Sequence, residues 1–297
     1  MIAINGKILK GIGGFYTVSG EDGALHECRA RGRFRLDRIT PLAGDNVLFT
    51  PQQGETDGFI EEILERSNIL VRPPVANIDL LIIVLSASKP KPDLLLADKL
   101  ILQAELARIH PAVCLNKTDA AADEAFAASL QEQYKSYPFY MASAATGAGM
   151  QEIKELLRGR LSAFTGQSAV GKSSLLNMLS GSLELKTGGL SKKVSRGKHT
   201  TRTSELLALP ELDAFAIDTP GFSIFDALDL EETRLSAYYP DFAPYLDGCR
   251  FTSCLHGNEP DCAVKQAVRE GHIHAERYER YLEILKFLKE KRSKQYD

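Results

Sequence analysis

The sequence lacks any apolar run long enough to cross a membrane. The longest such run among its 297 residues, residues 80–85, falls far short of the roughly 20 that a membrane helix requires. Residues 1–7 alternate polar and apolar and lack the basic start, apolar centre and cleavage site of a signal peptide. We therefore expect a cytoplasmic protein with no membrane partner.

The sequence also has few cysteines. Five cysteines in a cytoplasmic chain argue against a disulfide framework. Cys28 and Cys114 lie in strand-like stretches, where a small apolar core residue is expected. The net charge of −3 excludes little, because a weakly acidic total can hide local basic patches.

Length and composition predict more than one folded unit. At 297 residues the chain suggests about two domains, and a third small element if something other than burial stabilises it. We find no internal repeat. Nothing indicates an obligate oligomer, so we expect a monomer.

Residues 1–72 carry short β-branched runs separated by Gly, Pro and Asp turn signals, at 14–18, 33–36 and 46–50. This pattern predicts a five-stranded β-barrel of the OB type. Five arginines crowd one stretch, namely Arg29, Arg31, Arg33, Arg35 and Arg38. They favour either a surface that faces RNA or an ordinary solvated strand face.

Residues 73–228 alternate apolar, strand-like runs with helical patterns. The runs lie at residues 80–86, 112–115, 139–142, 161–165 and 214–217, and the helices at residues 94–109, 121–135, 151–157 and 174–179. Strands this apolar are covered on both faces, so an α/β domain with a parallel sheet is expected.

A phosphate-loop pattern follows the strand at residues 161–165. It consists of Gly166, Gln167, Ser168, Ala169, Val170, Gly171, Lys172 and Ser173, and Ser174 continues into a helix. Glycines let backbone N–H groups converge on phosphate oxygens, and the helix N-terminus adds partial positive charge. Lys172 is predicted to reach the β and γ phosphates, and Ser173 to bind Mg²⁺.

Two further motifs complete the predicted phosphate site. Asp218 ends an apolar strand and is followed by Gly221, which suits a carboxylate that holds Mg²⁺ and an N–H that meets the γ-phosphate. The polar, basic segment 191–203 between the motifs is predicted to be a switch, with Thr200 or Thr201 as its contact to Mg²⁺ and the γ-phosphate. The alternative for this segment is an ordinary flexible loop.

The base site precedes the phosphate site in this chain. Asn116, Lys117, Thr118 and Asp119 resemble the guanine-specificity motif of GTPases, and Ser143 and Ala144 begin a stretch that resembles the loop meeting guanine O6. By that resemblance Asp119 accepts hydrogen bonds from guanine, whereas adenine leaves the carboxylate unpaired. This order indicates a circularly permuted GTPase, whose last motif leads directly into the C-terminal region.

Residues 229–297 contain a group of metal ligands. Cys249, Cys254, His256 and Cys262 offer three thiolates and one imidazole within 14 residues, a set suited to a closed, structural Zn²⁺ site. Helical patterns begin at Ala263, and the basic residues that follow include Arg277 and Arg280. They predict either a second RNA-contacting surface or solvated helix faces.

Motif order and flanking regions together resemble the RsgA (YjeQ/YloQ) family of ribosome small-subunit-dependent GTPases, over essentially the whole chain. The resemblance implies an OB domain (1–72), a circularly permuted P-loop GTPase domain (73–228) and a zinc-binding helical domain (229–297). It also implies late assembly of the small (30S) ribosomal subunit, contact with its rRNA, and hydrolysis of GTP to GDP that the subunit stimulates. Ala169 departs from the family, which usually has Gly there; we expect a slight change of loop geometry.

Hydrolysis is predicted to be slow in isolation and to need a positioning group from the switch segment or from a partner. Phe222 stands where many GTPases place the glutamine that orients the attacking water, and a phenyl ring cannot do this. His199 is the internal candidate for that role, since an imidazole can accept a proton near neutral pH.

Two other functions stay open at this point. One is a P-loop ATPase or kinase, against which Asp119 argues. The other is a structural RNA-binding protein whose nucleotide site serves as an affinity switch.

Overall fold

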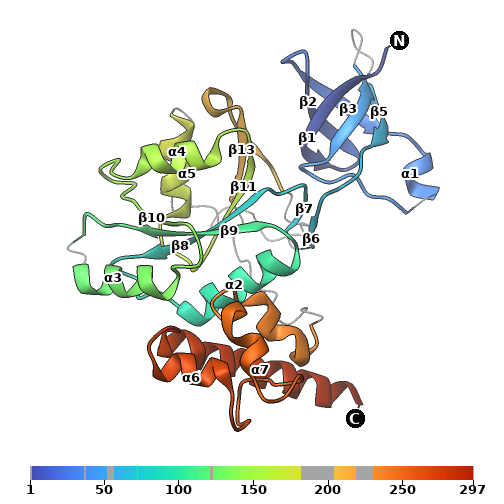
Figure 1. Cartoon of the computed structure of the whole chain (residues 1–297). Coiled ribbons are helices and arrows are strands. Elements are labelled where there is room, and N and C mark those ends of the chain that lie inside the picture. Colours follow the sequence, from blue (N-terminus) through green and yellow to red (C-terminus); the bar gives the residue numbers. More distant parts are fainter. Residues whose placement is uncertain are drawn as a thin grey trace, which may run out of the picture.

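The fold is taken from a computed structural model of the chain (Figure 1). It describes residues 2–36, 38–51, 57–71, 73–120, 123–181, 204–218 and 230–296, and every structural statement below refers to these residues.

Five strands near the N-terminus close into a barrel in the order β1-β2-β3-β5-β4. They are β1 (Ile4–Ile12), β2 (Phe15–Gly20), β3 (Leu25–Ala30), β4 (Asn46–Thr50) and β5 (Gly58–Ile63). Side chains that point inward, among them Ile8, Val18 and Phe49, are fully buried and form the barrel core. The predicted OB-type barrel is confirmed.

The stretch after β3 differs from the prediction. Residues 33–36 were expected to run as a strand, but Arg33–Leu36 form the short helix α1. An alternation of Arg with Phe and Leu over four residues does not distinguish a strand from a short helix, because the strand depends on pairing partners that are distant in the sequence.

A six-stranded sheet forms the centre of the molecule, in the order β10-β9-β8-β11-β13-β12. Its strands are β8 (Leu80–Ser86), β9 (His110–Asn116), β10 (Phe139–Met141), β11 (Leu161–Thr165), β12 (Leu207–Leu209) and β13 (Ala214–Asp218). All neighbours are parallel except β12 with β13. A small hairpin of β6 (Ile69–Val71) and β7 (Pro74–Ala76) joins the barrel to the sheet.

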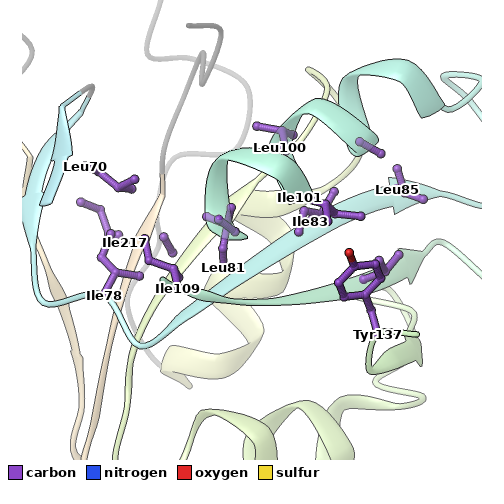
Figure 2. Close-up of a cluster of buried hydrophobic side chains, with 14 of the residues drawn as sticks. Leu70, Ile78, Leu81, Ile83, Leu85, Leu100, Ile101, Ile109, Tyr137 and Ile217 are labelled. Carbon is purple, nitrogen blue, oxygen red and sulfur yellow. The ribbon is translucent and has the colours of Figure 1, made fainter. Parts of the chain in front are cut away.

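Helices cover both faces of this sheet. On one face, Leu81, Ile83 and Leu85 of β8 pack with Leu100 and Ile101 (Figure 2). This face is covered by α2 (Leu94–Leu106) and α3 (Glu124–Gln133). The alternate residues of β8 contact the helices of the other face, α4 (Met150–Leu157) and α5 (Lys172–Ser180). The uniformly apolar strands therefore reflect a sheet buried on both sides.

The C-terminal region packs against α2, on a different side of the central sheet from the barrel (Figure 1). It consists of the 3₁₀ helices η3 (Glu232–Tyr238) and η4 (Ala243–Gly248), followed by α6 (Ala263–Arg269) and α7 (Ala275–Tyr296). A further 3₁₀ helix, η1 (Pro210–Leu212), lies between β12 and β13. No described helix is long and apolar enough to span a membrane.

Candidate nucleotide-binding and metal sites

The phosphate loop connects the end of β11 to the start of α5. Gly166 and Gly171 both have positive φ, 131° and 98°. A Cβ on Gly166 would lie 2.3 Å from the Val84 carbonyl oxygen, and one on Gly171 would lie 2.3 Å from the Asn116 amide nitrogen. Both positions therefore exclude any side chain, which ties the glycines of the motif to the shape of the loop.

Lys172 lies across this loop. Its Nζ donates to the carbonyl oxygens of Gly166 and Gln167, at 2.9 Å each. Burial lowers the pKa of the Lys172 ammonium, and the opposite charge of Asp218 partly offsets this effect. A half-buried ammonium held against the loop by two carbonyl oxygens is suited to an anionic ligand that binds at the same loop.

Ala169 has a backbone conformation that favours glycine. Its φ is 65°, in the left-handed region. The Lys117 Nζ donates to the Ala169 carbonyl oxygen at 2.7 Å, and to the Lys89 carbonyl oxygen at the same distance. The chain thus keeps the glycine-like geometry at this position despite the methyl group, at a cost in local strain.

Ser173, near the start of α5, lies beside Asp218, the last residue of β13. The Ser173 hydroxyl donates to the Asp218 Oδ2 at 2.9 Å. The second oxygen of Asp218, Oδ1, is buried and has no hydrogen-bond partner among the described residues. A hydroxyl oxygen and a carboxylate with an unsatisfied oxygen fit a hard cation such as Mg²⁺.

Asn116 joins the predicted base motif to the phosphate loop. Its amide donates to the Val170 carbonyl oxygen at 2.9 Å, and its Oδ1 accepts from the Ala144 N–H at 3.1 Å. Asn116 itself is buried at the end of β9. One side chain thereby links three segments that are distant in sequence.

The exposed carboxylate of Asp119 lies beside the second base segment. The Ser143 hydroxyl donates to Asp119 Oδ1 and accepts from the N–H groups of Ala145 and Thr146, at 3.2 and 3.1 Å. Thr118 donates its hydroxyl to the Ala142 carbonyl oxygen at 3.1 Å. The Ser143 hydroxyl thus holds the exposed Asp119 carboxylate beside the second base segment.

Several predicted residues lie outside the described part of the chain. They are His199, Thr200, Thr201, Gly221 and Phe222. Their roles stay predictions.

A link between the predicted switch and the barrel was not foreseen from the sequence. Glu205, just after the switch segment, pairs with Lys10 of β1, and the carboxylate accepts from the Lys10 Nζ at 2.7 Å. The Leu206 N–H donates to the Leu9 carbonyl oxygen at 2.9 Å. No local pattern signals a contact between residues nearly 200 positions apart.

The four predicted metal ligands come together in the C-terminal region. Their ligand atoms all lie within 4.8 Å of one another. The Nδ1 of His256 lies 3.5 Å from the Cys249 Sγ and 3.4 Å from the Cys262 Sγ, and the two sulfurs are 3.9 Å apart. A tetrahedral Zn²⁺, with Zn–S bonds of about 2.3 Å and a Zn–N bond of about 2.0 Å, places its ligands roughly 3.5 to 3.8 Å apart. The three distances among Cys249, His256 and Cys262 agree with such a site, and the whole cluster is wider, with ligand atoms up to 4.8 Å apart.

Burial adjusts the charge of these ligands. It lowers the pKa of His256, which favours the neutral imidazole that binds metals. It raises the pKa of the Cys254 thiol to about 12, so a thiolate there needs a cation beside it. The remaining two cysteines, Cys28 and Cys114, are buried in apolar surroundings as expected.

Two arginines of the predicted basic surface are buried instead. Arg277 and Arg280 of α7 both pair with Asp98 of α2, and Arg277 also pairs with Asp241. The pattern of charged residues along the helix did not reveal these ion pairs, because the acidic partner Asp98 lies 179 positions away from Arg277. Both interpretations, an RNA-contacting surface and a solvated helix face, are wrong for these two residues, because their side chains are buried.

Fold and site together define a P-loop GTPase whose elements are circularly permuted, since the strand and helix of the phosphate loop follow those of the base motif. A family model described as RsgA GTPase matches residues 63–228, and one described as RsgA N-terminal domain matches residues 5–60. The chain belongs to the RsgA family.

Relatives match over nearly the full length. A protein of Caldanaerobacter subterraneus subsp. tengcongensis named small ribosomal subunit biogenesis GTPase RsgA is 46% identical over 100% of this chain and 99% of its own length. A Ruminiclostridium cellulolyticum protein of the same name is 44% identical over 96% and 94%.

Solved structures of relatives agree with the fold. The crystal structure of YjeQ from Thermotoga maritima covers 97% of this chain and 99% of its own, with a TM-score of 0.82 and 33% identity. That of YloQ, described as a circularly permuted GTPase, covers 97% and 96%, with a TM-score of 0.81 and 35% identity.

Proposed function

We propose that this GTPase acts in late maturation of the small ribosomal subunit and hydrolyses GTP to GDP and phosphate under stimulation by that subunit. The names of its full-length relatives support this assignment. The observation that carries the nucleotide part is the set of hydrogen bonds through which Asn116 joins the phosphate loop to the base segments. These bonds make one continuous site from motifs whose order in the chain is inverted.

Different residues of this site bind different parts of the nucleotide. The backbone N–H groups of the loop, from Gly166 to Ser174, and the Lys172 ammonium bind the phosphates. Ser173 and Asp218 hold the Mg²⁺ that accompanies GTP, and Gly221 meets the γ-phosphate. Lys117 lies along the guanine ring, Asp119 accepts from its N1 and N2, and Ser143 and Ala144 form the loop at O6.

Hydrolysis requires a water molecule in line with the γ-phosphate. Phe222 cannot orient it, so we assign that role to His199, and we assign the contact with Mg²⁺ and the γ-phosphate to Thr200 or Thr201. Because Phe222 cannot orient the water, the isolated protein hydrolyses GTP slowly, and the ribosomal subunit accelerates hydrolysis by improving the orientation of the water and the stabilisation of charge.

The C-terminal cluster binds one structural Zn²⁺ through Cys249, Cys254, His256 and Cys262. Four protein ligands leave no open position for a water molecule, so the metal stabilises the loop and takes no part in catalysis.

The chain divides into an OB domain (1–72), a GTPase domain (73–228) and a zinc-binding domain (229–297). It works as a monomer in the cytoplasm, with no membrane partner. The barrel provides one surface for rRNA, on which Arg29 stacks 4.5 Å from the Phe15 ring centroid and Arg31 stacks 4.4 Å from that of Phe59. Asp57 and Glu61 pair with these arginines and hold the guanidinium planes in place.

Nucleotide competition tests the base site. A fluorescent GDP analogue bound to the protein should be displaced by GTP and GDP but not by ATP at the same concentration. Asp119→Ala should lower the affinity for GTP by 100-fold or more, because guanine loses a charged acceptor, and should leave ATP binding weak. Glu124→Ala, which removes a carboxylate from an exposed position of α3 outside the base motifs, is the matched control. Equal displacement by ATP would contradict the assignment of Asp119.

A further inference from the structure

The metal ligand His256 has a backbone conformation that is unusual for a residue other than glycine. Its φ is 57°, in the left-handed region, and the residue is 2% exposed. Side chains other than glycine adopt this region rarely. Other contacts must therefore hold the peptide in place while the imidazole points to the three sulfurs.

Glu259 bonds to the peptide groups on either side of His256. Its Oε1 accepts from the Leu255 N–H at 3.1 Å, and its Oε2 accepts from the Gly257 N–H at 2.8 Å. The carboxylate thus bridges the two peptide groups that flank the histidine. Hydrogen bonds to a charged acceptor are stronger than neutral ones, which suits a strained turn.

The carbonyl oxygens of the same turn are bound by the long C-terminal helix. The Tyr278 hydroxyl donates to the His256 carbonyl oxygen at 2.7 Å, and the Tyr281 hydroxyl donates to that of Leu255 at 2.9 Å. Both tyrosines belong to α7. The N–H groups are therefore held by Glu259 and the carbonyl groups by α7.

We propose that Glu259 is a positioning residue for the metal site, which holds His256 with its Nδ1 directed at the Cys249 and Cys262 sulfurs before the metal arrives. The inference rests on the zinc assignment proposed above. Outer groups that orient metal ligands typically contribute 10–100-fold to metal affinity. Glu259 is no ligand itself, since both its oxygens are bonded to backbone N–H groups.

Zinc affinity of the full-length chain tests this proposal, measured by competition with a chromophoric chelator. Glu259→Ala should weaken zinc binding about 10–100-fold, and Glu259→Gln, which keeps one acceptor oxygen, should weaken it less. Glu283→Ala removes the same charge from an exposed position on α7 and should leave the affinity unchanged. Binding of the fluorescent GDP analogue verifies that each variant is folded.

Cobalt substitution and a double-mutant cycle separate positioning from general stability. The d–d absorption of the Co²⁺ form should lose its tetrahedral intensity in Glu259→Ala. In a His256→Ala background, Glu259→Ala should have little further effect, because the ligand it positions is gone.

Different results would contradict the positioning role of Glu259 and the zinc assignment. Unchanged zinc affinity and cobalt spectrum in Glu259→Ala, or an equal loss with and without His256, would overturn the positioning role alone. A wild-type chain that binds no zinc would overturn the zinc assignment and this proposal with it.

Discussion

Ala169 shows how a single methyl group bears on the nucleotide site. In the sequence, Ala169 departs from the glycine that is usual in the family. In the structure, its φ is 65°, a conformation that favours glycine. The loop keeps its shape because Gly166 and Gly171 supply the close approaches that no side chain allows, and because Lys117 holds the Ala169 carbonyl oxygen.

Replacing Ala169 by Gly should stabilise the protein. Relief of the left-handed strain, about 1–2 kcal/mol, exceeds the added freedom of the unfolded chain, about 0.4–1 kcal/mol, so a net gain of roughly 1 kcal/mol is expected. Denaturant unfolding of the protein without nucleotide measures it. Ala148→Gly, at an exposed position with no positive φ, is the control and should destabilise. A loss of stability in Ala169→Gly would contradict the claim that the left-handed backbone conformation of Ala169 is strained.

Replacing His199 by Ala tests the assigned catalytic residue. The change should leave binding of the fluorescent GDP analogue intact and reduce subunit-stimulated turnover by about 10²–10⁴-fold, the usual contribution of a positioned acid–base group. The measurement is phosphate release under saturating GTP. If stimulated turnover were unchanged, His199 would have no part in orienting water.

The secondary structure elements show where sequence patterns suffice. Strands β8, β9 and β11 were predicted closely, because a strand buried on both faces is apolar throughout. The phosphate, base and metal motifs were located for a related reason, since each is short and its chemistry needs fixed spacing. The prediction of a barrel strand at residues 33–36 was wrong, because pairing with distant strands decides whether such a segment becomes a strand.

Contacts between distant elements were beyond the reach of sequence patterns. The basic face of α7 gave no sign that Arg277 would be 1% exposed, with Asp98 and Asp241 as partners and the rings of Tyr134, Tyr137 and Tyr239 around it. Burial of a charge is tolerated only with such partners, and the partners come from α2, the end of α3 and the segment after η3. The tertiary structure alone brings them together.

Asp98→Ala should destabilise the protein strongly. It leaves the buried guanidinium groups of Arg277 and Arg280 without their shared carboxylate, and breaking a buried pair in this way costs about 3–5 kcal/mol. Denaturant unfolding measures the loss. Glu155→Ala, which removes the partner of the exposed Arg158, should change stability far less. Similar effects of the two changes would contradict a buried network at α7.

Across the whole molecule, the GTPase core contacts the other two regions in different ways. The C-terminal region is fixed to α2 by buried ion pairs, so any shift of that region driven by the γ-phosphate has to carry α2 with it or break those pairs. The barrel instead contacts the residues that follow the switch segment, through Lys10 with Glu205 and Leu9 with Leu206. Under the proposed function, the barrel is therefore the more direct connection between the predicted switch and the proposed rRNA surface.

Release of phosphate from GTP and from ATP, each with and without purified small ribosomal subunits, tests the central claim most directly. The proposed function predicts slow release from GTP alone, a sharp rise when subunits are added, and little release from ATP in either condition. Turnover of GTP that subunits fail to accelerate would contradict the ribosomal role, and equal turnover of ATP would contradict the guanine site.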